Sequence, residues 1–425
     1  MLKDLSKQEL LSLQKELKEK YSKYKNMNLS LDMSRGKPGV EQLGVSEGLL
    51  KCIQTNEDCF SEDGIDCRNY SHLEGIPEAR KLFADIMGLS PDEVIAAGNS
   101  SLNIMYDTVA RGMLFGVLGS EKPWGKYDKI KFLCPVPGYD RHFTVCETFG
   151  IEMINVPMTA EGPDMDIIAN LVESDETIKG MWCIPKYSNP EGITYSDETV
   201  KKLAQLNPKA KDFRIFWDNA YVVHTFSDKE DHLLNLMDEL KKTGKEDMVF
   251  MFASTSKITF PGSGVAAIGA SVNNIKHISK DFFPQTICSN KLNQLRHVRY
   301  FKDAKGIKEH MKKHAAFLKP RFEVVLKTLS EQFGDGELAE WANPNGGYFV
   351  SCNVMNGCAK RTIALLKEAG VTMTPAGATF PYGKDPCDSN IRIAPTFPPV
   401  DELQTAMDMF CLCVKLAAVE KLLVE

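Results

Sequence analysis

Apolar positions along the chain alternate between helical and strand-like spacing. Residues 5–24 predict an amphipathic helix, because leucines recur on one face behind a capping box. Residues 72–88 predict a helix that is entered at a proline and closed by a glycine. Residues 102–118 predict a third, longer helix.

Between these helices lie short apolar runs that are bounded by turns. Such runs, alternating with helices, predict buried strands of a mostly parallel sheet that helices cover on both faces. The candidate strands are residues 94–97, 130–134, 180–184, 214–217, 248–253 and 265–270.

The character of the chain changes after about residue 290. Basic helical stretches lead to GGYFVSCNV, AGVTMTP and NIRIAP, and a last helix is predicted from Val400. We therefore expect a large α/β domain at 66–295 and a smaller α+β domain at 296–425. Residues 1–65, an N-terminal helix and a loop, are expected to join the small domain.

Composition and charge are those of an ordinary globular protein. The 425 residues are 43% hydrophobic and 25% charged, with a net charge of −6, which argues against disorder and against a nucleic-acid partner. Twelve scattered cysteines without a CxxC pair predict reduced thiols and a cytoplasmic protein. The charged start is unlike a secretory signal, and no apolar run is long enough for a membrane helix.

Five polar motifs each follow a candidate strand. Because the carboxyl ends of parallel strands form the functional edge of such a sheet, these motifs are expected to meet there. They are GNSS at 98–101, PGY at 137–139, SNPEG at 188–192, DNAY at 218–221 and STSK at 254–257.

Each candidate residue has an ordinary alternative when it is taken alone. Lys257 could be one more solvated lysine. Asp218 ends an apolar strand and could be a helix cap or half of a salt bridge, since a buried carboxylate needs a partner. His310 and His314 lack the glutamate of HExxH, so we expect a solvated basic face and no metal site. Cys411 and Cys413 are expected to pack in an apolar helix.

Taken together, the order and spacing of these motifs resemble the fold-type I pyridoxal-phosphate aminotransferases over nearly the whole chain. The resemblance rests also on Tyr70-x4-Gly75 and on Arg392 in NIRIAP. SRGKP, SKITFPGSG and PGYDRHF resemble more narrowly the subgroup 1c aspartate aminotransferases. This resemblance implies an α/β fold with a mostly parallel seven-stranded sheet between helices, a smaller α+β domain, and a homodimer with shared active sites.

The resemblance also implies catalytic roles. Lys257 would hold pyridoxal 5′-phosphate as a Schiff base and move the substrate proton. Asp218 would pair with the pyridine nitrogen and keep the ring protonated, so that the ring accepts electrons. Tyr221 and Asn189 would bond the phenolic oxygen of the ring, and the Asn189–Pro190 bond is expected to be cis.

The phosphate group of the cofactor would lie at a helix N-terminus among hydroxyl donors. The expected ligands are Asn99, Ser100, Ser101, Ser254 and Ser256, with Tyr70 from the partner of a dimer. Many relatives carry a phosphate-binding arginine about eight residues after the lysine, and this chain has none there. Tyr139 is the preferred residue to stack on the ring, with Val136 and Phe143 as alternatives.

Substrate contacts follow from the same resemblance. Arg392 would clamp the α-carboxylate bidentately, and Gly36 would let the chain pass close to the substrate. A dicarboxylate needs a second cation, for which Arg141 is slightly preferred over Arg35.

The expected reaction is amino transfer from aspartate or glutamate, with 2-oxoglutarate as acceptor. The same constellation also serves aromatic or kynurenine aminotransferases, C–S lyases and aminocyclopropane-carboxylate synthases. A ligand-sensing regulator domain is the alternative outside enzymes. It is disfavoured because the segment ahead of Tyr70 already supplies a helix and SRGKP.

Overall fold

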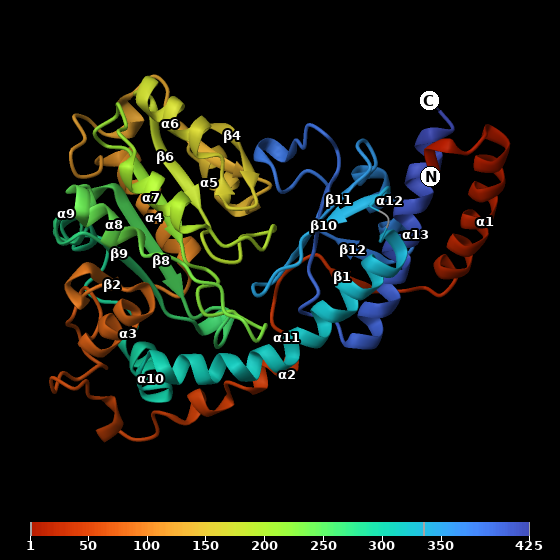
Figure 1. Cartoon of the computed structure of the whole chain (residues 1–425). Coiled ribbons are helices and arrows are strands. Elements are labelled where there is room, and N and C mark those ends of the chain that lie inside the picture. The colour runs from red at the N-terminus through yellow and green to blue at the C-terminus, as the bar shows by residue number, and fades with distance from the viewer. Residues whose placement is uncertain (1, 335, 425) are drawn as a thin grey trace.

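The computed structural model describes residues 2–334 and 336–424, and its centre is an eight-stranded sheet (Figure 1). The strand order is β2-β9-β8-β7-β6-β3-β4-β5. Neighbours from β8 to β4 are parallel, while β2–β9, β8–β9 and β4–β5 are antiparallel. The strands are β2 (Val94–Ala96), β3 (Lys131–Val136), β4 (Glu152–Thr159), β5 (Gly162–Pro163), β6 (Ile178–Cys183), β7 (Arg214–Asp218), β8 (Val249–Ser254) and β9 (Ala266–Ala270).

Helices cover both faces of this sheet, as expected for strands that are apolar on both sides. One face packs against α4, α5 and α9, and the other against α3, α6, α7, α8 and α10. The helices are α3 (Pro77–Met87), α4 (Ser101–Leu114), α5 (Asp140–Thr148), α6 (Met165–Ser174), α7 (Asp197–Gln205), α8 (Leu236–Thr243), α9 (Val272–Phe282) and α10 (Lys291–Phe301). We call this sheet and its helices the large lobe.

The six predicted strands of the large lobe are confirmed, but the sheet has eight strands where seven are expected. The pattern missed β4 and β5. Along β4 the exposure is mixed and a proline, Pro157, interrupts the apolar run, because this strand lies near the edge of the sheet. The two residues of β5 are too few to form a recognisable pattern.

Two small sheets and their helices form the small lobe, on the right of Figure 1. β1 (Leu31–Met33) pairs in parallel with β12 (Val371–Met373), and β11 (Val350–Val354) lies between β10 (Ala339–Trp341) and β13 (Asn390–Ile393). α1 (Lys7–Lys25), α12 (Ala359–Glu368) and α13 (Val400–Leu422) surround them in one apolar core. The capping box of α1 and the last helix from Val400 are confirmed.

The longest helix, α11 (Ala304–Phe333), runs beneath both lobes (Figure 1). The N-terminal segment follows it in the opposite direction, from β1 through α2 (Val40–Gly44) toward the large lobe. Short 3-10 turns complete the described chain, at Leu2–Asp4, Glu47–Lys51, Glu57–Cys59, Pro91–Glu93, Trp124–Lys126, Glu246–Met248, Pro261–Ser263 and Pro381–Gly383.

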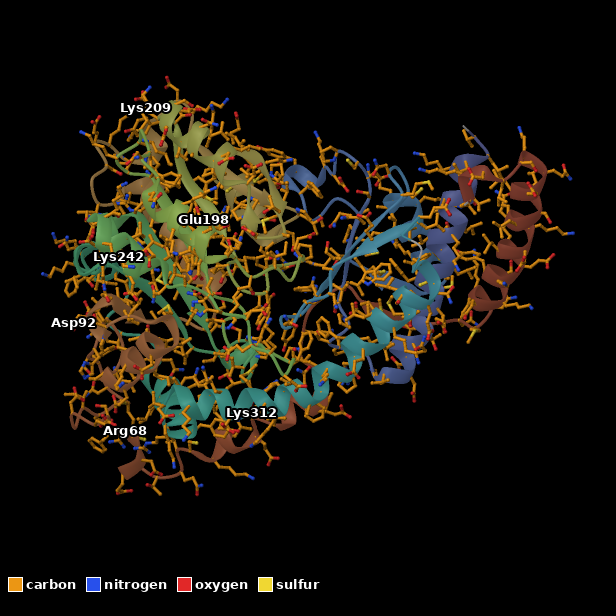
Figure 2. The ribbon with its side chains drawn as sticks, in the orientation of Figure 1. Arg68, Asp92, Glu198, Lys209, Lys242 and Lys312 are labelled. Atoms are coloured by element: carbon orange, nitrogen blue, oxygen red, sulfur yellow. The ribbon has the colours of Figure 1, made fainter. Side chains whose placement is uncertain are left out.

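Charged side chains such as Glu198, Lys242 and Lys312 project from the outer surface (Figure 2). Across residues 2–334 and 336–424, no helix combines the length and apolarity that crossing a membrane requires.

His310 and His314 correct the sequence analysis, because both side chains are buried and not solvated. His310 Nε2 lies 2.9 Å from the Ile258 carbonyl oxygen and 3.1 Å from His314 Nε2. The spacing i, i+4 places two residues on one face of a helix but does not say which face is buried. Burial, with the nearby His310, lowers the pKa of His314 to about 4 from an ordinary 6.5, and burial lowers the pKa of His310 as well.

These two histidines should make the protein less stable in weak acid. Between pH 6.5 and about 4 the unfolded chain binds protons that the buried imidazoles do not, so the free energy of unfolding falls as pH decreases. One such group contributes up to about 1.4 kcal/mol per pH unit. Urea unfolding measured between about pH 7.5 and pH 5 tests this dependence.

The matched variants are His314→Gln and His232→Gln, since the His232 side chain is 74% exposed. His314→Gln should reduce the slope of this pH dependence, because His310 and the other buried histidines still contribute, whereas His232→Gln should leave it as in the parent. Equal slopes in all three proteins would contradict this origin of the acid sensitivity.

Candidate active site

Lys257 lies in the loop after β8, at the carboxyl edge of the large sheet. Its Nζ lies 4.8 Å from the centroid of the Tyr221 ring, and Tyr221 comes from the loop after the neighbouring strand β7. The hydroxyl of Tyr348, from the small lobe, approaches the backbone oxygen of Lys257 at 3.5 Å. The expected meeting of the DNAY and STSK motifs is therefore found, and the small lobe closes over it.

Asp218, the last residue of β7, is buried with only half of its carboxylate paired. Its Oδ2 lies 3.2 Å from His142 Nε2, while no partner among the described residues reaches Oδ1. The His142 ring stacks on Trp182 with centroids 4.3 Å apart and planes at 10°, which holds the imidazole in place. A buried carboxylate oxygen without a partner is costly, so this atom is suited to a cationic donor that enters the site.

Two tyrosines surround this carboxylate. Burial raises the pKa of Tyr139 to about 12, and the nearby Lys257 ammonium opposes that rise. Burial also raises the pKa of Tyr221, with a further contribution from Asp218, while Arg392 and the Asn189 amide act in the opposite direction. Both phenols are therefore neutral hydrogen-bonding groups near pH 7.

Arg392 enters the site from β13 of the small lobe and is almost fully buried. Its Nη1 donates to Asn189 Oδ1 at 3.2 Å and to Asp140 Oδ1 at 2.9 Å, and its Nη2 donates to Thr374 Oγ1 at 3.3 Å. Asn189 precedes a cis proline, as expected. The SNPEG turn of the large lobe and the arginine of the small lobe thus meet directly.

Gly36, in the SRGKP loop, packs against the same arginine through one aromatic ring. The Arg392 guanidinium lies over the Phe349 ring, 4.7 Å from its centroid. On Gly36, a Cβ would lie 2.6 Å from Phe349 Cζ, which is too close for any side chain. The absence of a side chain at position 36 therefore lets the loop close on the Phe349–Arg392 stack.

The GNSS motif lies at the N-terminus of α4, as expected for a phosphate site. Ser100 is the N-cap residue and accepts a hydrogen bond from the Asn103 N–H. Ser254 Oγ donates to Ser256 Oγ, which in turn donates to the Asn99 carbonyl oxygen, each at 3.2 Å. The hydroxyls of the STSK motif are thereby joined to this helix N-terminus.

Neither position 264 nor position 265 can accommodate an arginine side chain in place of its own residue. The residue eight positions after Lys257 is Val265, which is buried and donates its N–H to Thr255 Oγ1 at 2.9 Å. At the preceding Gly264, a Cβ would lie 2.7 Å from the Asn99 carbonyl oxygen. A cavity of about 390 Å³ opens next to Asn99 and Gly264.

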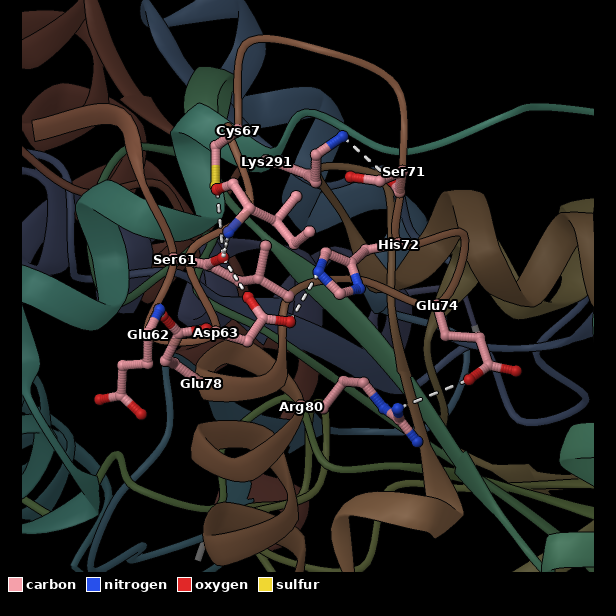
Figure 3. A network of polar contacts seen from close by, with 12 residues as sticks. Ser61, Glu62, Asp63, Cys67, Ser71, His72, Glu74, Glu78, Arg80 and Lys291 are labelled. Carbon is pink, nitrogen blue, oxygen red and sulfur yellow. Dashed lines mark hydrogen bonds and ion pairs between the residues drawn. The ribbon is translucent and has the colours of Figure 1, made fainter. Parts of the chain in front are cut away.

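Tyr70 is exposed in this chain, with 72% of its surface accessible. The buried ammonium of Lys291 holds its loop by donating to the backbone oxygens of Asn69 at 2.6 Å and Ser71 at 3.0 Å. Figure 3 shows this lysine above the network in which His72 lies 3.0 Å from Asp63. The exposed tyrosine thus belongs to a loop that Lys291 holds in place.

The two arginines considered for a distal carboxylate are both exposed. Arg35 precedes Gly36, and Arg141 follows Asp140 in the first turn of α5. Each neighbours a residue in contact with the Arg392 cluster, but neither guanidinium is buried in the site.

Three members of the site are not predicted from the sequence: Asp140, His142 and Thr374. The first two belong to the PGYDRHF motif, where a carboxylate and an imidazole two residues apart at a helix start were a recognisable feature. Thr374 lies beyond β12 with no motif around it.

His224 was also missed, although it lies within six residues of Asp218. Its ring packs edge-on against Tyr221 and against Tyr348, with centroids 5.7 Å away in each case. Burial, with the nearby Lys257, lowers its pKa to about 3, so this imidazole is neutral behind the site.

Comparisons with known proteins agree with this geometry. A family model described as aspartate amino-transferase matches residues 5–425. An aspartate aminotransferase of Corynebacterium glutamicum is 42% identical over 99% of this chain and 96% of its own length. The crystal structure of an aspartate transaminase from Corynebacterium glutamicum, also 42% identical, superposes with a TM-score of 0.96 over 99% of both chains.

A more distant structure shares the fold alone. It is an α-aminoadipate aminotransferase of Thermus thermophilus, complexed with N-(5′-phosphopyridoxyl)-L-leucine, at 20% identity and a TM-score of 0.73 over 93% of both chains. From the family match and the full-length relative, this chain belongs to the aspartate amino-transferase family.

Proposed function

We propose that the protein is a pyridoxal-phosphate-dependent aminotransferase that moves an amino group between aspartate or glutamate and 2-oxoglutarate. One observation carries the proposal: the buried, unpartnered Oδ1 of Asp218 lies in the same site as the Lys257 amine. A protonated ring nitrogen satisfies that oxygen, and a primary amine binds an aldehyde covalently. The donors at the site therefore fit the cofactor.

When bound, pyridoxal phosphate supplies a protonated ring that withdraws electrons from the substrate Cα. Lys257 anchors the cofactor and, once its amine is free, carries the proton from Cα. Asp218 keeps the ring nitrogen protonated, and His142 holds Asp218 in place through Oδ2. Tyr221 and Asn189 donate to the phenolic oxygen.

The phosphate is held without an arginine. The N-terminus of α4 supplies backbone N–H groups, and Asn99, Ser100 and Ser101, with Ser254 and Ser256, supply polar side chains. Tyr70 of a second subunit completes this phosphate site in a homodimer, which accounts for its exposure in the single chain. Tyr139 stacks on the ring. We place the enzyme in the cytoplasm.

Arg392 binds the α-carboxylate of every substrate, because its guanidinium is buried where both lobes meet. For the distal carboxylate of aspartate or glutamate we propose Arg141 ahead of Arg35. Arg141 lies next to Asp140, whose carboxylate already contacts Arg392.

Lys257→Ala should fold but lose both turnover and the visible absorbance of the bound cofactor.

Tyr70→Phe should release the cofactor faster, because the phosphate loses one hydroxyl donor. If Tyr70 acts across the dimer, mixing the two variants restores one complete site per hybrid: the Lys257 of one chain with the Tyr70 of the other. Cofactor retention and activity of the mixture measure this recovery, and no recovery despite verified subunit exchange contradicts a shared site.

Asp218→Asn should bind the cofactor but lower the half-reaction rate by orders of magnitude, because the neutral amide no longer keeps the ring nitrogen protonated. His142→Phe preserves the stack on Trp182 and leaves Oδ2 unpaired, so it should lower the same rate less strongly. Single-turnover spectra with glutamate measure both rates. A half-reaction at the parent rate in Asp218→Asn would show that this carboxylate is structural.

Arg141→Met should weaken aspartate and glutamate while affecting alanine much less. Because both guanidinium groups are exposed, the loss should be that of an exposed ion pair, up to about 1 kcal/mol. Arg35→Met is the matched comparison, and the variant with the selective loss identifies the distal cation. Equal losses for all substrates, or intact aspartate use in both variants, would contradict a role for these arginines.

A spectroscopic half-reaction screen against the twenty amino acids tests the substrate class itself. Bleaching by an amino acid and recovery with 2-oxoglutarate identify a transaminase. Steady release of pyruvate or ammonia without an oxo acid would instead identify a C–S lyase or a related eliminating enzyme.

A further inference from the structure

We propose that the carboxylate of Asp140 occupies the substrate position on Arg392 and must be displaced when an amino acid binds. Asp140 is thus a built-in competitor that sets the affinity for every α-carboxylate. The inference rests on the proposed function, in which Arg392 binds that carboxylate.

The hydrogen bonds of Arg392 engage both N–H groups of Nη1, while its buried Nε has no partner among the described residues. A carboxylate that binds a guanidinium end-on takes one N–H from each of its two terminal nitrogens. Nη1 has two N–H groups, and these already go to Asn189 Oδ1 at 3.2 Å and to Asp140 Oδ1 at 2.9 Å. Asn189 is buried, so Asp140 is the partner that can move away. The N–H of Nη1 that it accepts then becomes available to a substrate carboxylate.

The environment of Asp140 fits a group that moves aside. Its side chain is 33% exposed, whereas that of Arg392 is only 6% exposed. Asp140 is also the first residue of α5, where a carboxylate remains favourable beside the helix N-terminus after the ion pair is broken. The arginine can therefore stay in place while the aspartate turns toward water.

The stack of Phe349 on the guanidinium limits the other approaches. The ring covers one face of Arg392 at 4.7 Å, and Gly36 packs close to that ring. A carboxylate that approaches in the plane of the guanidinium, toward both terminal nitrogens, meets Asp140 there. Substrate binding is an exchange of one carboxylate for another.

A role of Asp140 in orienting Arg392 predicts the opposite change in substrate affinity from a role as competitor. If the ion pair merely holds Arg392 in position, removing it weakens substrate binding. If Asp140 competes, removing it strengthens binding. The sign of the change in affinity therefore decides between the two roles.

The experiment uses the holoenzyme and measures the concentration dependence of the half-reaction with glutamate and alanine. Asp140→Ala should lower the apparent dissociation constant of both amino acids by about fivefold, a change in the range of a partly exposed ion pair. Asp140→Asn should fall between the parent and the alanine variant, because an amide oxygen still accepts a hydrogen bond. Ethylamine, which lacks a carboxylate, should gain nothing.

Glu147→Gln is the matched control, since it removes one negative charge from the exposed end of the same helix. It should leave the amino-acid affinities unchanged. An equal gain in Glu147→Gln would show a general effect of charge and overturn the proposal. Weaker or unchanged binding in Asp140→Ala would overturn it as well. Absence of any half-reaction in the parent holoenzyme would instead refute the proposed function.

Discussion

A buried guanidinium, that of Arg392, is the constraint on which the junction of the two lobes depends. Burying a charge costs desolvation free energy, which is offset only if hydrogen bonds replace the lost hydration. Here the large lobe supplies Asn189 and Asp140, and the small lobe supplies Thr374 and the Phe349 ring. Neither lobe alone supplies all of these contacts, so the charge couples the packing of one lobe to that of the other.

The first turn of α5 joins this junction to the centre of the large sheet. Asp140 contacts Arg392, and His142, two residues later, contacts Asp218. The turn is itself fixed by Gly138, whose N–H donates to the Thr379 carbonyl oxygen at 2.7 Å. One short segment therefore sets the positions of the two charges that a cofactor and a substrate require in an aminotransferase.

Much of this architecture is predictable from the sequence, because buried parallel strands are apolar and the motifs follow them. The meeting of Lys257, Asp218, Tyr221, Asn189 and Arg392 follows from the sheet order and from the family resemblance. The hydrogen-bond partners of these residues cannot be predicted from the sheet order or from the motifs. Asp140 and Arg392 are 252 positions apart, and only the assembled lobes bring them together.

Local sequence patterns also fail to predict strands and buried residues where a segment is only partly exposed. The half-exposed β4, with Pro157 inside it, does not show the continuous apolar run of a central strand. Lys312 and Lys313, between His310 and His314, suggest a solvated stretch, yet both imidazoles face Ile258 and Gln42 inside the fold. Composition averaged over a helical turn cannot distinguish its two faces.

The long helix α11 contains one position at which it can bend most easily. Pro320 lies inside it and cannot donate a hydrogen bond to the Ala316 carbonyl, so the helix is weakest there. Residues 321–333 span about 20 Å, and a bend of about 10° at Pro320 moves their far end by about 3 Å, roughly the size of a carboxylate. Arg321, the next residue, donates from Nε to the Pro398 carbonyl oxygen just before α13. A bend at this proline would therefore displace the part of α11 that packs in the small lobe together with the start of α13.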